Sequence, residues 1–358
     1  MSRPEDATGP GTPQVAALHR DLLRWYESER RDLPWRRTRD PYAIWVSEIM
    51  LQQTRVETVV PYWERFLARF PTAMALAEAP EDDVLAMWSG LGYYRRARLL
   101  HAGARAVAER GALPKNREGL LLVPGIGRYT AGAVASIAYG EPVGLVDGNV
   151  ARVLSRVFLI EDDMRKAGMK KAEALADQIV AKKDPGAWNQ ALMELGATIC
   201  TPQRPLCVRC PLSKSCLAKK AGRVDELPML SPKKKPEERR VQALVATNGG
   251  DVLLLRRKRD RLFGGLWEPP CLEGTLAARK DLTRRFDAQG VKKSGKVTHV
   301  LSHRKLSIDV ARGEVDESAL HASLPDDYDA ARLVNPSKLD DLGIATLARK
   351  ILAAGMIE

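Results

Sequence analysis

The sequence predicts a protein of two domains, a large helical domain followed by a smaller domain that combines helices with a β-sheet. Two observations lead to this fold class. Apolar residues recur with a helical period from residue 14 to about residue 228, between short Gly/Pro breaks. Beyond residue 238 the pattern changes to alternating, β-rich runs, and the first two of them flank an Asn-Gly-Gly-Asp turn. A chain of 358 residues has room for both domains.

Composition sets the expected domain boundaries. Residues 1–13 lack the pattern of a signal peptide, and we interpret them as a disordered tail on a cytoplasmic protein. Residues 14–221 form the helical domain, and residues 238–358 form the α+β domain. The stretch 222–237 between them contains three prolines and three consecutive lysines, which is typical of a linker. No apolar run is long enough to span a bilayer, so we expect no membrane association.

The helical domain can be divided into individual helices. The first helix, which follows Gln14, places Val15, Leu18, Leu22 and Trp25 on one apolar stripe. The Asp40-Pro41 pair opens the second helix, with aspartate as the N-cap and proline at the first helical position. Further helices are expected at 56–68, 81–88, 94–109, 129–139, 148–158, 169–181 and 188–196.

Charge and cysteine usage narrow the function. The net charge of +12 favours a polyanionic partner such as nucleic acid, although a generally basic proteome would give the same value. Four of the five cysteines cluster with the spacing C-x6-C-x2-C-x5-C, and Cys271 stands alone. In an intracellular chain this crowding favours a metal over disulfides, and four thiolates suit either zinc or an iron–sulfur cluster. The candidate ligands are Cys200, Cys207, Cys210 and Cys216.

Two carboxylates are candidates for catalysis. Glu48 lies within the apolar run IWVSEIMLQQTR, where burial without a nearby cation would raise its pKa and keep it protonated near neutral pH. Asp147, in LVDGNVARVL, precedes a helix, and the N–H groups of that helix would keep it ionised. Cleavage of a glycosidic bond uses two carboxyl groups tuned apart in this way. Each residue also has a plain structural interpretation, Glu48 as an acid at the edge of a core and Asp147 as an N-cap.

The stretch LLVPGIGRYTAGAV, residues 121–134, predicts a tight hairpin between two helices. Gly125 and Gly127 allow a close backbone approach, and N–H groups at the start of the second helix form an anion site suited to a DNA phosphate. A lone Pro-Gly-x-Gly is weak evidence, but here it precedes an aspartate in a basic helical protein.

Together, WVSEIMLQQT, LVPGIGRYTA, VDGNVAR and the four-cysteine run resemble the helix-hairpin-helix DNA glycosylases, and most closely the MutY-type adenine glycosylases that act on adenine opposite 8-oxoguanine. The resemblance extends from about residue 14 to the end and is densest up to Cys216. It implies a helix-hairpin-helix motif at about 121–134 and a [4Fe-4S] cluster on the loop 200–216, with zinc as the minor alternative. The implied partner is duplex DNA with an A:8-oxoguanine or A:G mispair, bound by a monomer.

The resemblance also implies roles for individual residues. Glu48 matches the acid that protonates adenine at N7 and then handles the water, and Asp147 matches the carboxylate that stabilises the oxocarbenium ion or a covalent sugar intermediate. Asn149 matches a neighbour that hydrogen-bonds within this site. Tyr129 falls where lyase-competent relatives carry a nucleophilic lysine, so we expect a monofunctional hydrolase that leaves an abasic site.

Two further sets of residues match substrate contacts of the family. The residues that match the adenine pocket are Trp35, Arg36, Leu51, Val56 and Gln190. Those that match the wedge and the duplex contacts are Gln53, Thr54, Leu91 and Tyr93, while Gly125 and Gly127 of the hairpin are the expected phosphate contacts. Without the resemblance, Leu91 and Tyr93 would read as ordinary packing residues and Gln190 as a surface amide.

The C-terminal domain resembles the Nudix-like domain that recognises 8-oxoguanine, and LFGGLWEPP matches one of its loops. The stretch GTLAARKDLTRRFDAQG lacks the paired acids that a pyrophosphohydrolase needs for Mg²⁺, so we expect recognition and no hydrolysis here. Ser302 and His303 are expected to contact the lesion, or are otherwise surface residues of a strand. Leu301 replaces the Phe that the family usually has before them.

Three rival functions are weighed against this interpretation. A bifunctional pyrimidine-damage glycosylase is disfavoured by Tyr129 and by the additional C-terminal domain. A catalytically silent mismatch-binding protein is disfavoured by the presence of both Glu48 and Asp147. A nucleotide-pool hydrolase that uses the C-terminal domain is disfavoured by the missing acids.

Overall fold

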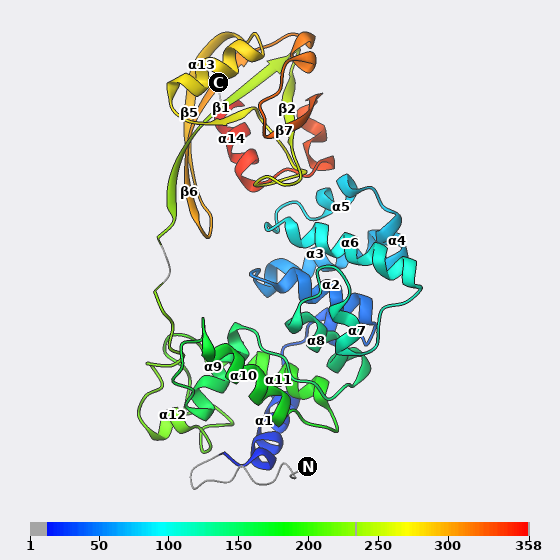
Figure 1. The fold of residues 1–358 in the computed structure, drawn as a ribbon, viewed down its shortest axis with the longest axis vertical. Coiled ribbons are helices and arrows are strands. Elements are labelled where there is room, and N and C mark those ends of the chain that lie inside the picture. Colours follow the sequence, from blue (N-terminus) through cyan, green and yellow to red (C-terminus); the bar gives the residue numbers. More distant parts are fainter. Residues whose placement is uncertain (1–12, 233–234, 357–358) are drawn as a thin grey trace. The chain divides into compact units, whose positions relative to one another are not determined.

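A computed structural model describes residues 13–232 and 235–356 (Figure 1). The tail expected at residues 1–13 thus lies, except for its last residue, outside the described residues. The chain divides into two compact units. The first contains the chain up to Trp63, Thr72–Met74 and Ala102–Pro232; the second contains Glu64–Pro71, Ala75–His101 and the described chain after residue 234. The second unit therefore includes helical residues that the sequence assigned to the first domain.

The helical part has the predicted character, and within the described ranges no helix is long and apolar enough to cross a membrane. One of its elements, Pro34–Arg36 (η1), is a short 3-10 helix. The helical elements before the sheet are α1 (Val15–Glu29), η1 (Pro34–Arg36), α2 (Pro41–Leu51), α3 (Val56–Arg69), α4 (Ala73–Glu78), α5 (Glu81–Met87), α6 (Arg95–Arg110), α7 (Arg117–Leu121), α8 (Arg128–Tyr139), α9 (Gly148–Phe158), α10 (Ala167–Ile179), α11 (Pro185–Thr198) and α12 (Leu217–Lys220).

The first helix buries a different stripe from the one predicted. Leu18, Leu22 and Tyr26 are its buried residues, whereas Val15 is 37% exposed and Trp25 is only partly buried. The buried residues follow each other at intervals of four, which keeps them on one side of a helix. The predicted stripe was therefore wrong at its two ends.

The C-terminal part of the second unit is built on one mixed sheet in the order β3-β2-β1-β6-β5, with β4 paired to β1 and β7 paired to β2. Strands β1 and β6 are parallel, and the other pairs are antiparallel. The elements are β1 (Glu237–Asn248), β2 (Asp251–Arg257), β3 (Trp267–Glu268), β4 (Cys271–Glu273), α13 (Leu276–Arg285), β5 (Gln289–Val300), β6 (Arg304–Glu314), η2 (Glu317–His321), β7 (Tyr328–Val334), η3 (Pro336–Asp341) and α14 (Thr346–Met356).

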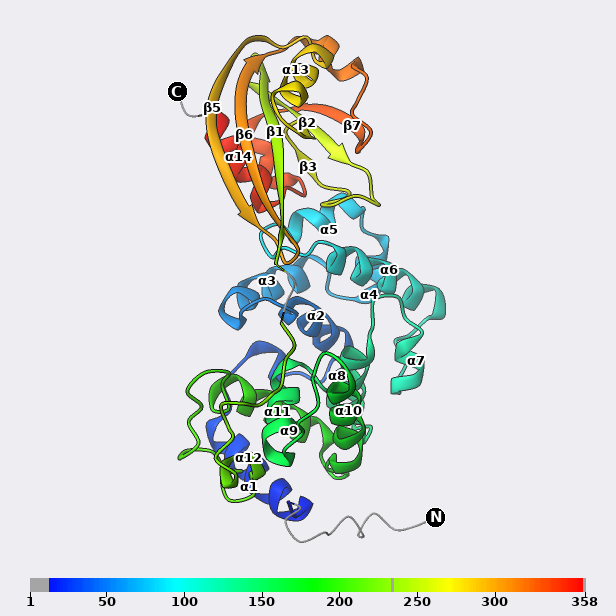
Figure 2. The same ribbon diagram turned by 60° about the vertical axis from the view of Figure 1, so that its left-hand side comes forward.

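The sheet is covered on both faces (Figure 2). Along β1, Ala243 and Val245 pack with residues of α14, while Leu244 and Ala246 pack with Leu282 and Phe286 of α13 or its end. Successive side chains of a strand point to opposite faces, so one apolar strand supplies both cores. The predicted α+β domain is therefore a sheet between two helices.

The start of the predicted linker packs on the first unit. Leu227 is 2% exposed and belongs to a small apolar cluster with Cys216 and Ala218. The carbonyl of Leu227 accepts a hydrogen bond of 2.9 Å from Nε of Arg156, and the backbone N–H of Met164 donates to the carbonyl of Met229 at 2.9 Å. The chain is thus held against the cysteine loop for several residues after α12.

Candidate active site and cysteine loop

Glu48 is placed by a helix that is buried along most of its length. Asp40 caps α2 by accepting a hydrogen bond from the N–H of Tyr42, and Pro41 occupies the first turn, as predicted. Every residue of α2 from Tyr42 to Met50 is buried, and Glu48 is 4% exposed. The hydroxyl of Tyr129 donates a hydrogen bond of 2.6 Å to Oε2 of Glu48. A buried acid therefore has one specific partner, contributed by another helix.

Burial raises the pKa of Glu48 to about 7, because removal from water penalises the charged carboxylate. The hydrogen bond from Tyr129 lowers it, the charge of Asp147 raises it, and the charge of Arg36 lowers it. At neutral pH the side chain is thus near the midpoint of its titration. A group with this pKa can give up a proton and take one back, as general acid–base catalysis requires.

Tyr129 lies near the start of α8, within the stretch 121–134 that predicted the hairpin. Its hydroxyl is also 3.1 Å from Sδ of Met193 on α11. Burial raises the pKa of this phenol well above its ordinary range, so it remains a hydrogen-bond donor. A phenol offers no amine for a Schiff base. Met193 was not predicted, because nothing in an apolar helix stretch distinguishes it.

Asp147 caps α9, as predicted. Its Oδ1 accepts a hydrogen bond of 2.7 Å from the N–H of Val150, and its Oδ2 accepts one of 3.1 Å from Nδ2 of Asn149. Its pKa is nevertheless raised, because burial outweighs the hydrogen bonds that favour the ionised form. The sequence predicted that the cap keeps this carboxyl ionised, and the hydrogen bonds from Val150 and Asn149 act in that direction, so the ionised state stays a prediction.

A buried arginine connects this carboxylate to the first cysteine. Arg152, on α9, is 8% exposed. Its Nη2 donates to Oδ1 of Asn149 and to the carbonyl of Gly196, both at 2.8 Å, and its Nε donates to the carbonyl of Cys200 at 2.7 Å. Asn149 in turn holds Asp147. The orientation of the Asp147 carboxylate is thus linked to the chain that enters the cysteine loop.

A third buried carboxylate was missed by the sequence reasoning. Glu194 is 1% exposed and binds Nη2 of Arg36 at 2.8 Å and the guanidinium of Arg31 at 2.8 and 2.9 Å. Burial opposes its ionisation, but the hydrogen bonds from Arg31 and Arg36 outweigh burial and lower its pKa to about 2. An acid inside the apolar run WNQALMELGA is the signal that identified Glu48, and it would have found Glu194 as well.

The residues that match the adenine pocket all belong to the first unit. Trp35 is 6% exposed and packs edge to face on Trp63 with ring centroids 6.0 Å apart. Leu51 and Val56 are half-buried at the end of α2 and the start of α3. Gln190 is half-buried on α11, and its Nε2 donates to the carbonyl of Gly186 at 3.3 Å. Gln190 shares a helix face with Met193 and Glu194, which lie three and four residues further along.

The hairpin connects α7 to α8, as predicted. Gly125 has φ +81°, a left-handed conformation that glycine adopts without cost, and Gly127 is the N-cap residue of α8. A Cβ added at Gly127 would meet nothing within 4 Å, so this side of the turn is open. Gln53 and Thr54 lie just after α2, where Gln53 is exposed with φ +59°.

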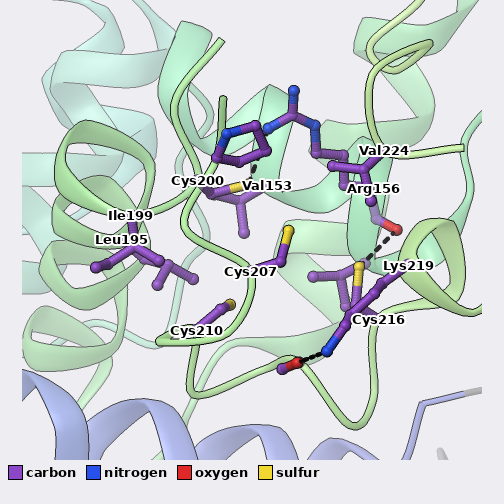
Figure 3. Close-up of a pocket in the computed structure, with 13 residues that line it drawn as sticks. Val153, Arg156, Leu195, Ile199, Cys200, Cys207, Cys210, Cys216, Lys219 and Val224 are labelled. Carbon is purple, nitrogen blue, oxygen red and sulfur yellow. Dashed lines mark hydrogen bonds between the residues drawn. The ribbon is translucent and has the colours of Figure 1, made fainter. Parts of the chain in front are cut away.

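The four clustered cysteines line a single cavity of about 380 Å³, counting its open mouth (Figure 3). Arg156 lies against them, with its Nη1 3.4 Å from Sγ of Cys200 and its carbonyl accepting from Sγ of Cys216 at 3.4 Å. Burial first, and then the neighbouring cysteines, raise the pKa of Cys210 to about 12 and also raise that of Cys216. A bound cationic metal centre would reverse this by favouring the thiolates.

The spacing of these ligands bears on what they hold. Within residues 13–232 and 235–356, no three His, Cys, Asp or Glu side chains form a group that would bind one metal ion. A single zinc ion needs four ligand atoms at about 2.0–2.3 Å from one centre. Four cysteine thiolates can hold either a zinc ion or an iron–sulfur cluster.

The second unit contains the remaining predicted contacts. The loop Gly90–Tyr94 joins α5 to α6, and Tyr93 in it has φ +47° and is 49% exposed. The hydroxyl of Tyr93 lies 3.0 Å from Oγ of Ser302, in the turn between β5 and β6. Leu91, by contrast, is 6% exposed, so it is a packed residue in this structure. His303 is exposed beside Ser302, and Leu301 packs partly on the core beneath α14.

The helix that carries the metal-binding acids in Nudix hydrolases is basic here. Of the residues from Arg279 to Arg285 on α13, Asp281 is the acid, and it forms ion pairs with Arg284 and Arg285. The expectation that this domain does not hydrolyse pyrophosphate stays a prediction.

Comparison with known proteins identifies both parts. The family "HhH-GPD superfamily base excision DNA repair protein" matches residues 46–180, and a NUDIX domain matches residues 241–354. The adenine DNA glycosylase of Homo sapiens is 35% identical over 405 aligned residues, which cover 94% of this chain and 74% of that protein. The adenine DNA glycosylase of Rattus norvegicus is 39% identical, covering 83% of this chain and 70% of that protein.

Solved structures resemble the helical part. A thermostable thymine-DNA glycosylase is 30% identical with a TM-score of 0.52, covering 58% of this chain and 97% of that one. A trapped covalent intermediate of endonuclease III with DNA has a TM-score of 0.50 at 22% identity, covers 58% of this chain and 98% of that one, and supports the fold alone.

The helical fold, the hairpin and the two family matches define a helix-hairpin-helix glycosylase of base-excision repair that carries a C-terminal NUDIX domain. The resemblance read from the sequence motifs is confirmed. The chain belongs to the family of adenine DNA glycosylases.

Proposed function

We propose that the protein removes adenine mispaired with 8-oxoguanine or guanine from duplex DNA and leaves an abasic site. One observation carries the proposal. Glu48 and Asp147 are two carboxyl groups in different surroundings: burial raises the pKa of Glu48 to about 7, whereas hydrogen bonds from Val150 and Asn149 favour the ionised form of Asp147. Hydrolysis of a bond to an anomeric carbon uses such a pair, one as proton donor and one to stabilise positive charge on the sugar.

Glu48 has the role of the acid. A base in a duplex must be flipped out before a side chain can reach it, and adenine then enters the pocket near Arg36 and Trp35. The protonated carboxyl gives its proton to N7 of the adenine, which makes the base a neutral leaving group. Its pKa of about 7 leaves roughly half of the molecules protonated at neutral pH.

Asp147 has the role of the charge stabiliser. The N–H of Val150 and Nδ2 of Asn149 hold its two oxygens and favour the ionised form against burial. As the bond to adenine breaks, positive charge develops on the sugar, and a fixed carboxylate lowers the energy of that state. Glu48, now ionised, then accepts a proton from the water that attacks the sugar. Because Tyr129 has no amine, the reaction ends at the abasic site without strand cleavage.

The four cysteines of the loop 200–216 would hold a [4Fe-4S] cluster, with Arg156 beside the ligands. Bound through four thiolates, the cluster supplies a cross-link that fixes this loop. Through Arg152, the loop supports the orientation of Asn149 and Asp147.

The C-terminal domain would read the base opposite the adenine. Ser302 and His303 present exposed polar groups at a hairpin turn, next to the half-exposed ring of Tyr93. Gly125, Gly127, Gln53 and Thr54 would contact the duplex backbone of the same DNA. We propose that the protein acts as a monomer in the cytoplasm.

Single-turnover release of adenine tests the proposal. The substrate is a duplex with one adenine opposite 8-oxoguanine, and wild type is compared with Glu48→Gln and with Glu109→Gln, an exposed residue on α6. We expect rapid release by wild type and by Glu109→Gln, and almost none by Glu48→Gln with duplex binding retained. Binding without release by wild type would favour a silent mismatch-binding protein. Equal release by all three proteins would make Glu48 a structural acid.

A further inference from the structure

The residues on both sides of the loop proposed to touch the duplex donate hydrogen bonds to the same carbonyl group of the C-terminal domain. Oγ of Ser89 donates a hydrogen bond of 2.9 Å to the carbonyl of Ile344, and the hydroxyl of Tyr94 donates one of 3.0 Å to the same atom. These donors stand at the two ends of the loop Gly90–Tyr93. Ile344 is fully buried and forms a β-bridge with Trp267, so the acceptor belongs to the rigid part of the domain.

Further contacts within the second unit hold the same region. Nη1 of Arg98 donates to the carbonyl of Arg259 at 3.0 Å, and the guanidinium of Arg259 is 3.3 Å from the carboxylate of Glu81. A Cβ added at Gly343 would lie 2.8 Å from Cβ of Leu85, so α5 approaches the backbone as closely as a glycine allows. Helices α5 and α6 are therefore seated on the C-terminal domain on both sides of the loop.

The loop itself is internally rigid. Gly90, Gly92 and Tyr93 all have left-handed backbone conformations, with φ of 100°, 70° and 47°. The carbonyl of Gly92 accepts hydrogen bonds from Nε1 of Trp88 at 3.1 Å and from Nη2 of Arg96 at 3.3 Å. The N–H of Gly90 donates to the hydroxyl of Tyr94 at 3.2 Å. A displacement of Ser89 or Tyr94 therefore moves the whole loop, including Tyr93.

We propose that Ser89 and Tyr94 are positioning residues. They hold the loop Gly90–Tyr93, which contains the predicted wedge residues, at a fixed position relative to the β5–β6 turn that contains Ser302. The position that Ser89 and Tyr94 maintain places the Tyr93 hydroxyl 3.0 Å from Oγ of Ser302. This inference rests on the proposed function. Its consequence is specific: the two hydroxyl groups control how well 8-oxoguanine is preferred over guanine, and they leave the chemistry at Glu48 unchanged.

The test measures single-turnover adenine release by the full chain from two duplexes, one with A:8-oxoguanine and one with A:G. The variants are Ser89→Ala, Tyr94→Phe and the double variant, each of which removes a hydroxyl group and little else. Tyr139→Phe is the matched control, because its hydroxyl makes one long bond of 3.4 Å to the carbonyl of Leu113 in the other unit. Gly343→Ala independently perturbs the contact between α5 and the C-terminal domain, because its added Cβ would lie 2.8 Å from Cβ of Leu85.

We expect the double variant to lose about tenfold in rate on A:8-oxoguanine and to keep its rate on A:G, so the ratio of the two rates falls about tenfold. Ser89→Ala should lose about threefold, as the loss of one hydrogen bond implies. Tyr94→Phe should lose at least as much, because it also removes the acceptor of the Gly90 N–H. Gly343→Ala should lower the same ratio, and Tyr139→Phe should not. If the double variant does not fold, Ser89→Ala and Gly343→Ala decide the question. An unchanged ratio, or an equal loss on both duplexes, overturns the inference. No adenine release by wild type from either duplex would instead overturn the proposed function.

Discussion

The hydrogen bond from Tyr129 to Glu48 should set the pH at which the enzyme works. Replacing Tyr129 with Phe keeps the ring and removes the hydroxyl that donates to Oε2 of Glu48 at 2.6 Å. That hydroxyl lowers the pKa of Glu48 by stabilising its charged form. Without it, the pKa must rise, and the protonated acid must persist to higher pH.

The size of the shift follows from the surroundings of the bond. A hydrogen bond to a charged group contributes about 1.5–3 kcal/mol, and one pKa unit corresponds to about 1.4 kcal/mol. Glu48 is only 4% exposed, so solvent does little to replace the lost donor. Starting from a pKa of about 7, we expect a value of about 8 to 9 in Tyr129→Phe.

The assay is the pH dependence of single-turnover adenine release from the A:8-oxoguanine duplex. In wild type the rate should fall as the pH rises through about 7, where Glu48 loses its proton. In Tyr129→Phe the fall should move upward by about one to two pH units. Tyr139→Phe should behave like wild type, because its hydroxyl bonds elsewhere. An unmoved profile, or one displaced to lower pH, would refute the role assigned to this hydrogen bond.

The remaining predictions concern stability, the cysteine loop and the C-terminal domain. Burial raises the pKa of Glu48 from 4.5 to about 7, so its stabilising contribution is complete below 4.5 and is lost as the pH rises through 7. Denaturant titration should therefore show Glu48→Gln more stable than wild type by about 3 kcal/mol at about pH 8, with little gain at about pH 4; a pH-independent difference would contradict this. Glu194 has a pKa lowered to about 2, so its contribution is present above 4.5 and is lost as the pH falls towards 2. Glu194→Gln should cost about 3 kcal/mol near neutral pH and much less in acid, and equal costs at both would argue against the ion pairs. Iron analysis should find about four iron atoms per chain, and Cys207→Ser should lower both iron content and Tm; stoichiometric zinc would overturn the cluster assignment. The full chain with Mg²⁺ should release no pyrophosphate from an 8-oxoguanine nucleoside triphosphate, and measurable release would revive the rival hydrolase function.

Local features of the chain were predictable because short segments determine them. The caps at Asp40 and Asp147 were read correctly, since a capping side chain bonds only a few residues ahead. The hairpin glycines and the basic character of α13 were likewise visible in a few consecutive residues. Glu48 was recognised as a buried acid because most of its neighbours on α2 are apolar.

The pKa values and the burial of individual side chains were harder to predict from the sequence. The raised pKa of Asp147 was not foreseen, because burial depends on helices that pack around it from other parts of the chain. The stripe of α1 was misjudged at Trp25 and Tyr26, where several apolar residues compete for one face. Glu194 was missed, although the sequence held the same kind of signal that identified Glu48.

By itself, the sequence determined the longer helices before the sheet, the first β-hairpin, the capping of α2 and α9, and the set of chemical groups available for catalysis. Each of these depends on spacing within a few residues, where side-chain chemistry and backbone geometry act locally. Only the tertiary structure decided which groups meet. It brought Tyr129 to Glu48 across 81 residues, Arg36 to Glu194 across 158 and Tyr94 to Ile344 across 250. The physical reason is that burial and long-range hydrogen bonds arise from packing of the whole chain, and these two effects set the pKa values and the positions on which the chemistry depends.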